Sequence, residues 1–172
     1  MLRTLRQISR IGIISETAPE PNEAWRLREN LQTEILHILG RALCIRHVDA
    51  GSCNGCELEI HALSNPYYNI EGLGIKFVAS PRHADLLLVT GPMSRNMESA
   101  LQRVYEATPD PKLVVTIGDC GSENGFFCAN YAVRGKVSDI VPVDVHVPGC
   151  PPSPTALLQG IATAINTHKK SK

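Results

Sequence analysis

Residues 84–89 read ADLLLV, and residues 113–117 read LVVTI. Both runs are short and almost continuously apolar, which is typical of strands in a parallel sheet that is covered on both faces. Further strands are predicted near residues 45–49, 75–79 and 141–147, and helical patterns fill the segments between the strands. This alternation predicts an α/β fold with a mainly parallel sheet and helices on both faces.

Helix signals in the connections consist of capping residues at the start and prolines near the end. The amphipathic stripe after Asn22 predicts a helix that either covers the core or binds a partner, and both interpretations stay open. The last helix is predicted from Ser153 to about Asn166, with Pro154 in its first turn. Two more are predicted, from about Cys56 to just before Asn65 and from Ser94 to about Thr108.

The length and composition limit the possible classes of protein. With 172 residues, 43% of them hydrophobic and 20% charged, the chain is expected to form one globular domain. The charges of its 17 basic and 17 acidic residues cancel, so the chain lacks the excess of positive charge that is typical of nucleic-acid-binding proteins. No apolar run approaches the roughly 18 residues that span a bilayer, and any membrane contact is therefore expected to be peripheral.

The two ends of the chain are predicted to lie outside the domain, which we place at residues 22–168. Residues 1–21 are expected to form a flexible or partner-docking arm, because Arg3, Arg6 and Arg10 alternate with apolar residues. A transit peptide has a similar pattern, but an arm that contacts a partner or a lipid surface is the favoured interpretation. Residues 169–172 are predicted to be a frayed basic tail.

The six cysteines are the candidate metal-binding or catalytic residues of the chain. Without an export signal, thiols serve metals or catalysis more often than disulfides. Cys53 and Cys56 lie in a glycine-rich loop after the first strand, whereas Cys120 and Cys150 each follow a later strand. Such turns gather at the carboxyl edge of an open parallel sheet, so we expect these four thiols to converge. The two others, Cys44 and Cys128, have the settings of buried structural thiols.

Four cysteine thiolates can bind either a zinc ion or an iron–sulfur cluster, so two kinds of metal site are possible. Structural zinc sites are often built from two local pairs of ligands. Here only Cys53 and Cys56 form a local pair, and the other two cysteines stand alone on glycine-flanked turns. The spacing therefore favours a cluster, with a zinc-stabilised scaffold as the alternative.

Four ordered motifs add a resemblance that covers roughly residues 45–165. They are GSCNGCE at 51–57, SPRHAD at 80–85, GDCG at 118–121 and PGCPP at 148–152. Together they resemble the small subunit of energy-converting, membrane-bound nickel-iron hydrogenases of the formate hydrogenlyase type. They are also similar to the related 20 kDa iron–sulfur subunit of respiratory complex I.

The resemblance implies a flavodoxin-like fold with an N-terminal helix and arm, and one 4Fe-4S cluster. It implies that the chain is the electron-transfer subunit of an oxidoreductase complex, without substrate chemistry of its own. Implied partners are a large nickel-iron catalytic subunit, a ferredoxin-like subunit and membrane subunits at the cytoplasmic face of the inner membrane. The cluster ligands carried over from the motifs are Cys53, Cys56, Cys120 and Cys150.

Two points of the resemblance leave alternatives open. Glu57 and Glu59 follow the cysteine pair, where the family is expected to have an acid for proton movement, but Glu57 equally suits the start of a helix. Complex I relatives usually have adjacent cysteines at the first motif, so the spaced pair favours the hydrogenase branch. The alternative is a complex I-like NADH/quinone oxidoreductase, with Tyr67 and Tyr68 near the acceptor.

Overall fold

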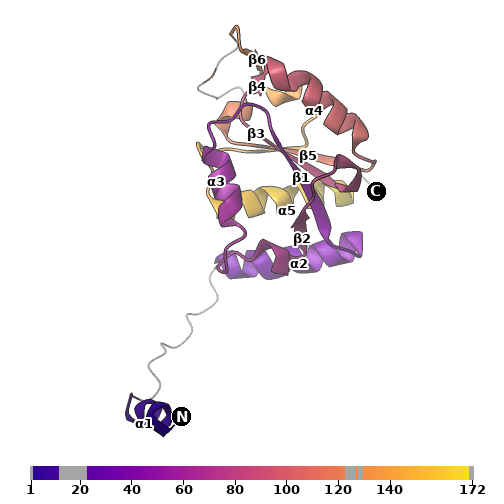
Figure 1. The fold of residues 1–172 in the computed structure, drawn as a ribbon. Helices are drawn as coiled ribbons and strands as arrows, with labels where there is room; N and C mark the ends of the chain where they lie inside the picture. Colours follow the sequence, from indigo (N-terminus) through magenta and orange to yellow (C-terminus); the bar gives the residue numbers. More distant parts are fainter. Residues whose placement is uncertain (1, 12–22, 123–126, 128–129, 171–172) are drawn as a thin grey trace.

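The computed structural model describes residues 2–11, 23–122, 127 and 130–170. Its centre is a sheet of five strands that all run parallel, in the order β2-β1-β3-β5-β7 (Figure 1). This is the flavodoxin-like order of the doubly wound folds, as expected from the sequence. The strands are β1 (Leu43–Asp49), β2 (Ile75–Phe77), β3 (Leu86–Thr90), β5 (Leu113–Ile117) and β7 (Val145–Val147).

Helices cover both faces of this sheet. One face packs against α2 (Glu23–Leu39), α3 (Gly55–Ala62) and α5 (Pro154–Lys170), with Ile35, Ile60 and Ile161 in its core. The opposite face packs against α4 (Arg95–Ala107), whose Leu101 is fully buried. The central strand β3 is buried along its whole length, because both of its faces are covered. The predicted layering is confirmed.

Shorter elements connect these layers. A small antiparallel pair is formed by β4 (Met93–Ser94) and β6 (Val133–Gly135), and it was not predicted because two or three residues carry too little periodicity. A separate helix, α1 (Leu2–Ile11), lies within residues 1–21, the segment that was predicted to form an arm. The 3-10 turns are η1 (Ile70–Leu73), η2 (Pro81–His83), η3 (Asp119–Gly121) and η4 (Val137–Asp139).

The predicted helices all form, with differences at their ends. The Ser153 hydroxyl accepts a hydrogen bond from the amide of Ala156, at 3.3 Å, and so caps α5 as expected. This helix runs to Lys170, about one turn beyond the predicted Asn166. Ser94 stands at the cap position of α4 with extended backbone, but its side chain makes no capping hydrogen bond. Asn22, the predicted cap of α2, lies outside the described residues.

Candidate metal centre

Four of the cysteines lie at one edge of the sheet. Cys53 and Cys56 stand where β1 passes into α3, Cys120 lies in η3 directly after β5, and Cys150 follows β7. Because all three strands are parallel, their carboxyl ends point to the same side. The structure therefore brings together the thiols that the sequence analysis selected.

Specific contacts join the first cysteine turn to the second. The Sγ atom of Cys56 lies 3.9 Å from the carbonyl oxygen of Ile117, the last residue of β5. A Cβ atom on the next residue, Gly118, would stand only 2.7 Å from the same sulfur. Gly118 has a φ of 84°, where residues with side chains are strained. A glycine at this position therefore makes room for Cys56 above the turn that carries Cys120.

The second turn is bonded in the same way to the third. Asp119 accepts a hydrogen bond from the amide of Gly149 through Oδ1, at 2.8 Å, and its own amide donates to the Gly149 carbonyl, at 2.9 Å. These bonds fix the residue before Cys120 to the residue before Cys150. The position of one thiol relative to the other is thus set by backbone and carboxylate bonds.

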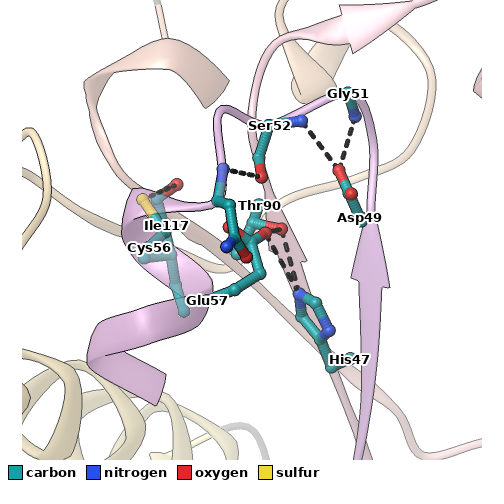
Figure 2. A network of polar contacts seen from close by, with 9 residues as sticks. His47, Asp49, Gly51, Ser52, Cys56, Glu57, Thr90 and Ile117 are labelled. Atoms are coloured by element: carbon teal, nitrogen blue, oxygen red, sulfur yellow. Dashed lines mark hydrogen bonds and ion pairs between the residues drawn. The ribbon is translucent and has the colours of Figure 1, made fainter. Parts of the chain in front are cut away.

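The turn that carries Cys53 is held by side chains of the same segment (Figure 2). Asp49 Oδ1 accepts from the amides of Gly51, at 2.8 Å, and Ser52, at 2.7 Å. Ser52 Oγ in turn accepts from the amide of Asn54, at 3.0 Å. These bonds stabilise a tight turn and so hold the backbone on both sides of Cys53 in place.

The charges that act on Cys56 include those of the three other candidate thiols. The pKa of this thiol is raised from 9.0 to about 12. Burial contributes most to the increase, because a thiolate loses hydration there. Negative charges on four neighbours raise the pKa further, and these neighbours are Glu57, Cys120, Cys53 and Cys150. A bound cation would reverse this balance, because it stabilises thiolates.

The remaining cysteines are placed differently. Cys44 is half-buried near the amino end of β1, at the opposite edge of the sheet, and its sulfur lies 3.8 Å from the Ala42 carbonyl. Cys128 lies outside the described residues. Among the residues that the structure describes, no three His, Cys, Asp or Glu side chains lie close enough to hold a single metal ion.

The two glutamates after Cys56 differ in their surroundings. Glu57 is buried, with 8% of its surface exposed, whereas Glu59 is half-buried on the same helix. The hydroxyl of Thr90 donates to Glu57 Oε1. His47 Nε2 lies 3.0 Å from the Thr90 hydroxyl and 3.6 Å from Glu57 Oε1 (Figure 2). A role for either glutamate in proton movement stays a prediction.

His47 and Thr90 were missed by the sequence analysis. His47 could have been found from the strand pattern, because it lies on the same face of β1 as the buried Leu43 and Ile45. A histidine that follows two core positions, at the carboxyl end of a strand, indicates a polar partner from another element. Thr90 offers a weaker signal, as the only polar residue of β3.

The tyrosines considered for the quinone alternative lie beyond the other end of α3. Their rings form an edge-to-face pair with centroids 4.9 Å apart. The amide of Tyr68 donates to Asn65 Oδ1, at 2.9 Å. Cys56 is in the first turn of α3, so the tyrosine pair follows the end of this helix that is opposite to the thiol.

Sequence comparison decides the family. The family described as "NADH ubiquinone oxidoreductase, 20 Kd subunit" matches residues 53–164, which include all four candidate thiols. The chain belongs to this family. The match extends from the Cys53 turn into α5 and so includes four of the five strands of the sheet, all but β1, together with the turns that carry the four thiols.

The chain is similar to named subunits of a formate hydrogenlyase, a membrane-bound hydrogenase and an NADH-quinone oxidoreductase. It is 46% identical over 136 residues to formate hydrogenlyase subunit 7 of Escherichia coli (strain K12), which covers 79% of this chain and 53% of the relative. It is 44% identical over 149 residues to the probable membrane-bound hydrogenase subunit mbhJ of Pyrococcus furiosus, which covers 87% and 89%. The chain thus spans about half the length of the first relative and most of the second.

A solved structure gives the same assignment at the level of the fold. The membrane-bound sulfane sulfur reductase, an archaeal respiratory membrane complex, contains a chain that superposes with a TM-score of 0.68 at 29% identity. The match covers 83% of this chain and 77% of the other. One relative is thus named as a membrane-bound hydrogenase subunit, and the solved structure is that of a membrane-bound reductase. In the described part of this chain, no helix is both long and apolar enough to cross a bilayer.

Proposed function

We propose that this chain holds one 4Fe-4S cluster and transfers electrons within a membrane-associated nickel-iron hydrogenase or formate hydrogenlyase complex. The observation that carries the proposal is the convergence of thiols from three separate turns at one edge of the sheet. The proposed ligands are Cys53, Cys56, Cys120 and Cys150.

The donor set and the glycine turns fit such a group. Thiolates are the usual ligands of iron–sulfur clusters, and turn amides that donate to sulfur raise the cluster potential. When bound, the cluster supplies one-electron redox chemistry. The chain contributes the ligands, and the bonds between Asp119 and Gly149 hold two of the turns in a fixed relative position.

A zinc scaffold is the competing use of the same thiols. Four thiolates around one zinc ion lie about 2.3 Å from the metal and so close to one another. The spacing of the cysteines favours a cluster over zinc, because Cys53 and Cys56 form a local pair whereas Cys120 and Cys150 each stand on a separate turn. Anaerobically purified protein is expected to contain about four irons and four sulfides per chain. One zinc with little iron, in a colourless protein, would instead establish the scaffold.

A large catalytic subunit is the proposed partner at this edge. Cys53 and Cys150 are exposed, and Leu58, in the first turns of α3, has 61% of its surface exposed. An apolar side chain beside exposed thiols is expected to be covered in the complex. We therefore expect Leu58→Lys to release the chain from the large subunit while iron binding by the isolated chain is retained. Co-purification together with iron analysis measures both.

The family description also supports a second candidate, the quinone branch related to complex I. The spaced cysteine pair Cys53 and Cys56 favours the hydrogenase branch over it, and the tyrosine pair gives the quinone branch no support because it lies away from the thiols. The intact assembly distinguishes the two candidates. Nickel in the large subunit and hydrogen uptake support the hydrogenase, whereas quinone reduction without nickel supports the alternative.

The arm is proposed to hold the complex at the cytoplasmic face of the inner membrane. In α1, Leu2 and Leu5 have 84% and 62% of their surfaces exposed, and Arg6 and Arg10 are also exposed. Exposed leucines with arginines and no acid suit a surface of anionic lipids. Deletion of residues 2–15 should move the complex to the soluble fraction with its cluster intact. Retention at the membrane would reject this role for the arm.

A further inference from the structure

Glu57 is an acid buried beside a proposed cluster ligand. It follows Cys56 in the first turn of α3, and only 8% of its surface is exposed. An acid near the start of a helix is stabilised by the helix dipole, but an exposed side chain gains that stabilisation too. The burial of Glu57 therefore needs another explanation, because burial of a carboxylate is costly.

The contacts of Glu57 hold the carboxylate in place without neutralising it. Thr90 donates its hydroxyl hydrogen to Oε1, and His47 contacts both groups (Figure 2). Burial lowers the pKa of His47 more than the carboxylate raises it, so the ring is neutral at pH 7. Among the described residues, the second carboxylate oxygen, Oε2, is buried and has no hydrogen-bond partner. His47 is therefore not a cation that would offset a negative charge on Glu57.

The charge of Glu57 acts on the neighbouring sulfur. After burial, it is the largest contribution to the raised pKa of Cys56, ahead of each of the other three thiols. A negative charge that disfavours a thiolate also disfavours an added electron on a cluster held by that thiolate. The effect of a buried charge is larger than that of an exposed one, because water screens it less.

We propose that the carboxylate of Glu57, positioned by Thr90 and His47, lowers the reduction potential of the cluster that Cys56 helps to hold. This inference rests on the proposed function. It assigns Glu57 an electrostatic role and Thr90 a positioning role, because Thr90 contacts the carboxylate rather than a ligand sulfur.

The test compares two neutral replacements on one helix. Glu57→Gln keeps the shape and the acceptor oxygen for Thr90 but removes the charge. Glu59→Gln removes an equal charge two residues further on, at a half-buried position where water screens it. The full chain, loaded anaerobically with iron and sulfide, is titrated against potential and followed by electron paramagnetic resonance. Glu57→Gln is expected to shift the midpoint to more positive values, and Glu59→Gln to shift it much less.

A double variant tests the part played by Thr90. Thr90→Val removes the hydroxyl that fixes the carboxylate and is expected to shift the midpoint in the same direction. Added to Glu57→Gln, it should cause little further shift, because there is no charge left to position. Equal shifts in the two single glutamate variants, or additive effects of Thr90→Val and Glu57→Gln, would overturn the inference.

Iron analysis separates this outcome from failure of the proposed function. If wild-type chain binds no cluster, both proposals fail. If wild-type and variant chains each bind about four irons and the midpoint of Glu57→Gln is unchanged, only the role of Glu57 is rejected.

Discussion

Replacement of Gly118 by alanine is expected to damage the metal centre more than the fold. The added Cβ would stand 2.7 Å from Cys56 Sγ, where atoms in contact normally keep about 3.5–4.0 Å. The sulfur therefore has to move by about 1 Å, or the turn before Cys120 has to open. Both responses separate thiols that must act together.

The magnitude follows from two costs. The backbone of Gly118, with φ 84° and ψ 152°, lies near a region that only glycine occupies readily, and a residue with a side chain there costs about 1–3 kcal/mol. Overpacking against Cys56 adds about 1–3 kcal/mol. The expected loss of about 2–6 kcal/mol is a large part of the roughly 5–15 kcal/mol that stabilise a typical domain.

Two measurements on the full chain check this prediction. Urea unfolding of the metal-free protein gives the loss of stability, and iron analysis after reconstitution gives the loss of binding. Gly40→Ala is the matched control, since Gly40 has a φ of 63° but nothing within 4 Å of an added Cβ. The Gly40→Ala variant should lose only about 1–2 kcal/mol of its free energy of unfolding and should bind as much iron as the wild type. Full iron content and wild-type stability in Gly118→Ala would show that the turn before Cys120 accepts a side chain at position 118.

Three further predictions concern single groups. In metal-free protein at pH 8, Cys53 should react with iodoacetamide at least about tenfold faster than Cys56. The reason is that a pKa of about 12 leaves the Cys56 thiol almost entirely protonated. Equal rates of modification, measured by mass spectrometry, would contradict this. Asp119→Ala breaks the bond to the Gly149 amide and should destabilise the chain by about 1–3 kcal/mol and reduce iron binding, measured by urea unfolding and iron analysis. Burial lowers the pKa of His47 below 6.5, so the unfolded chain binds a proton first and stability should fall as pH drops below 6.5 toward the lowered pKa. His47→Gln should weaken that fall in urea unfolding at pH 7 and pH 5.5, and an identical pH dependence would show that His47 does not cause it.

Local sequence determined the strands and most of the helices. The apolar run in β3 could be predicted because a strand buried on both faces needs no polar alternation. The start of α5 could be predicted from Ser153 and Pro154, because capping and first-turn residues act within a few positions. The end of α5 could not be predicted, because no proline or glycine stands between Asn166 and Lys170 to stop the helix.

The four thiols were also selected from sequence alone. Each follows a predicted strand, and the rule that parallel strands share a carboxyl edge was enough to expect convergence. Their order along the chain and the glycines around them needed no coordinates. The role of the thiols as cluster ligands remains the proposal that iron analysis tests.

Only the tertiary structure showed what surrounds the thiols. The bond between Thr90 and Glu57 joins residues 33 positions apart, and the bond from Gly149 to Asp119 joins residues 30 positions apart. No periodicity or capping pattern encodes such pairs, because they form when separate turns are packed against one another. The sequence by itself determined which chemistry gathers at the edge of the sheet. Packing decided which carboxylate is buried beside Cys56, because burial depends on neighbours that are distant in the chain.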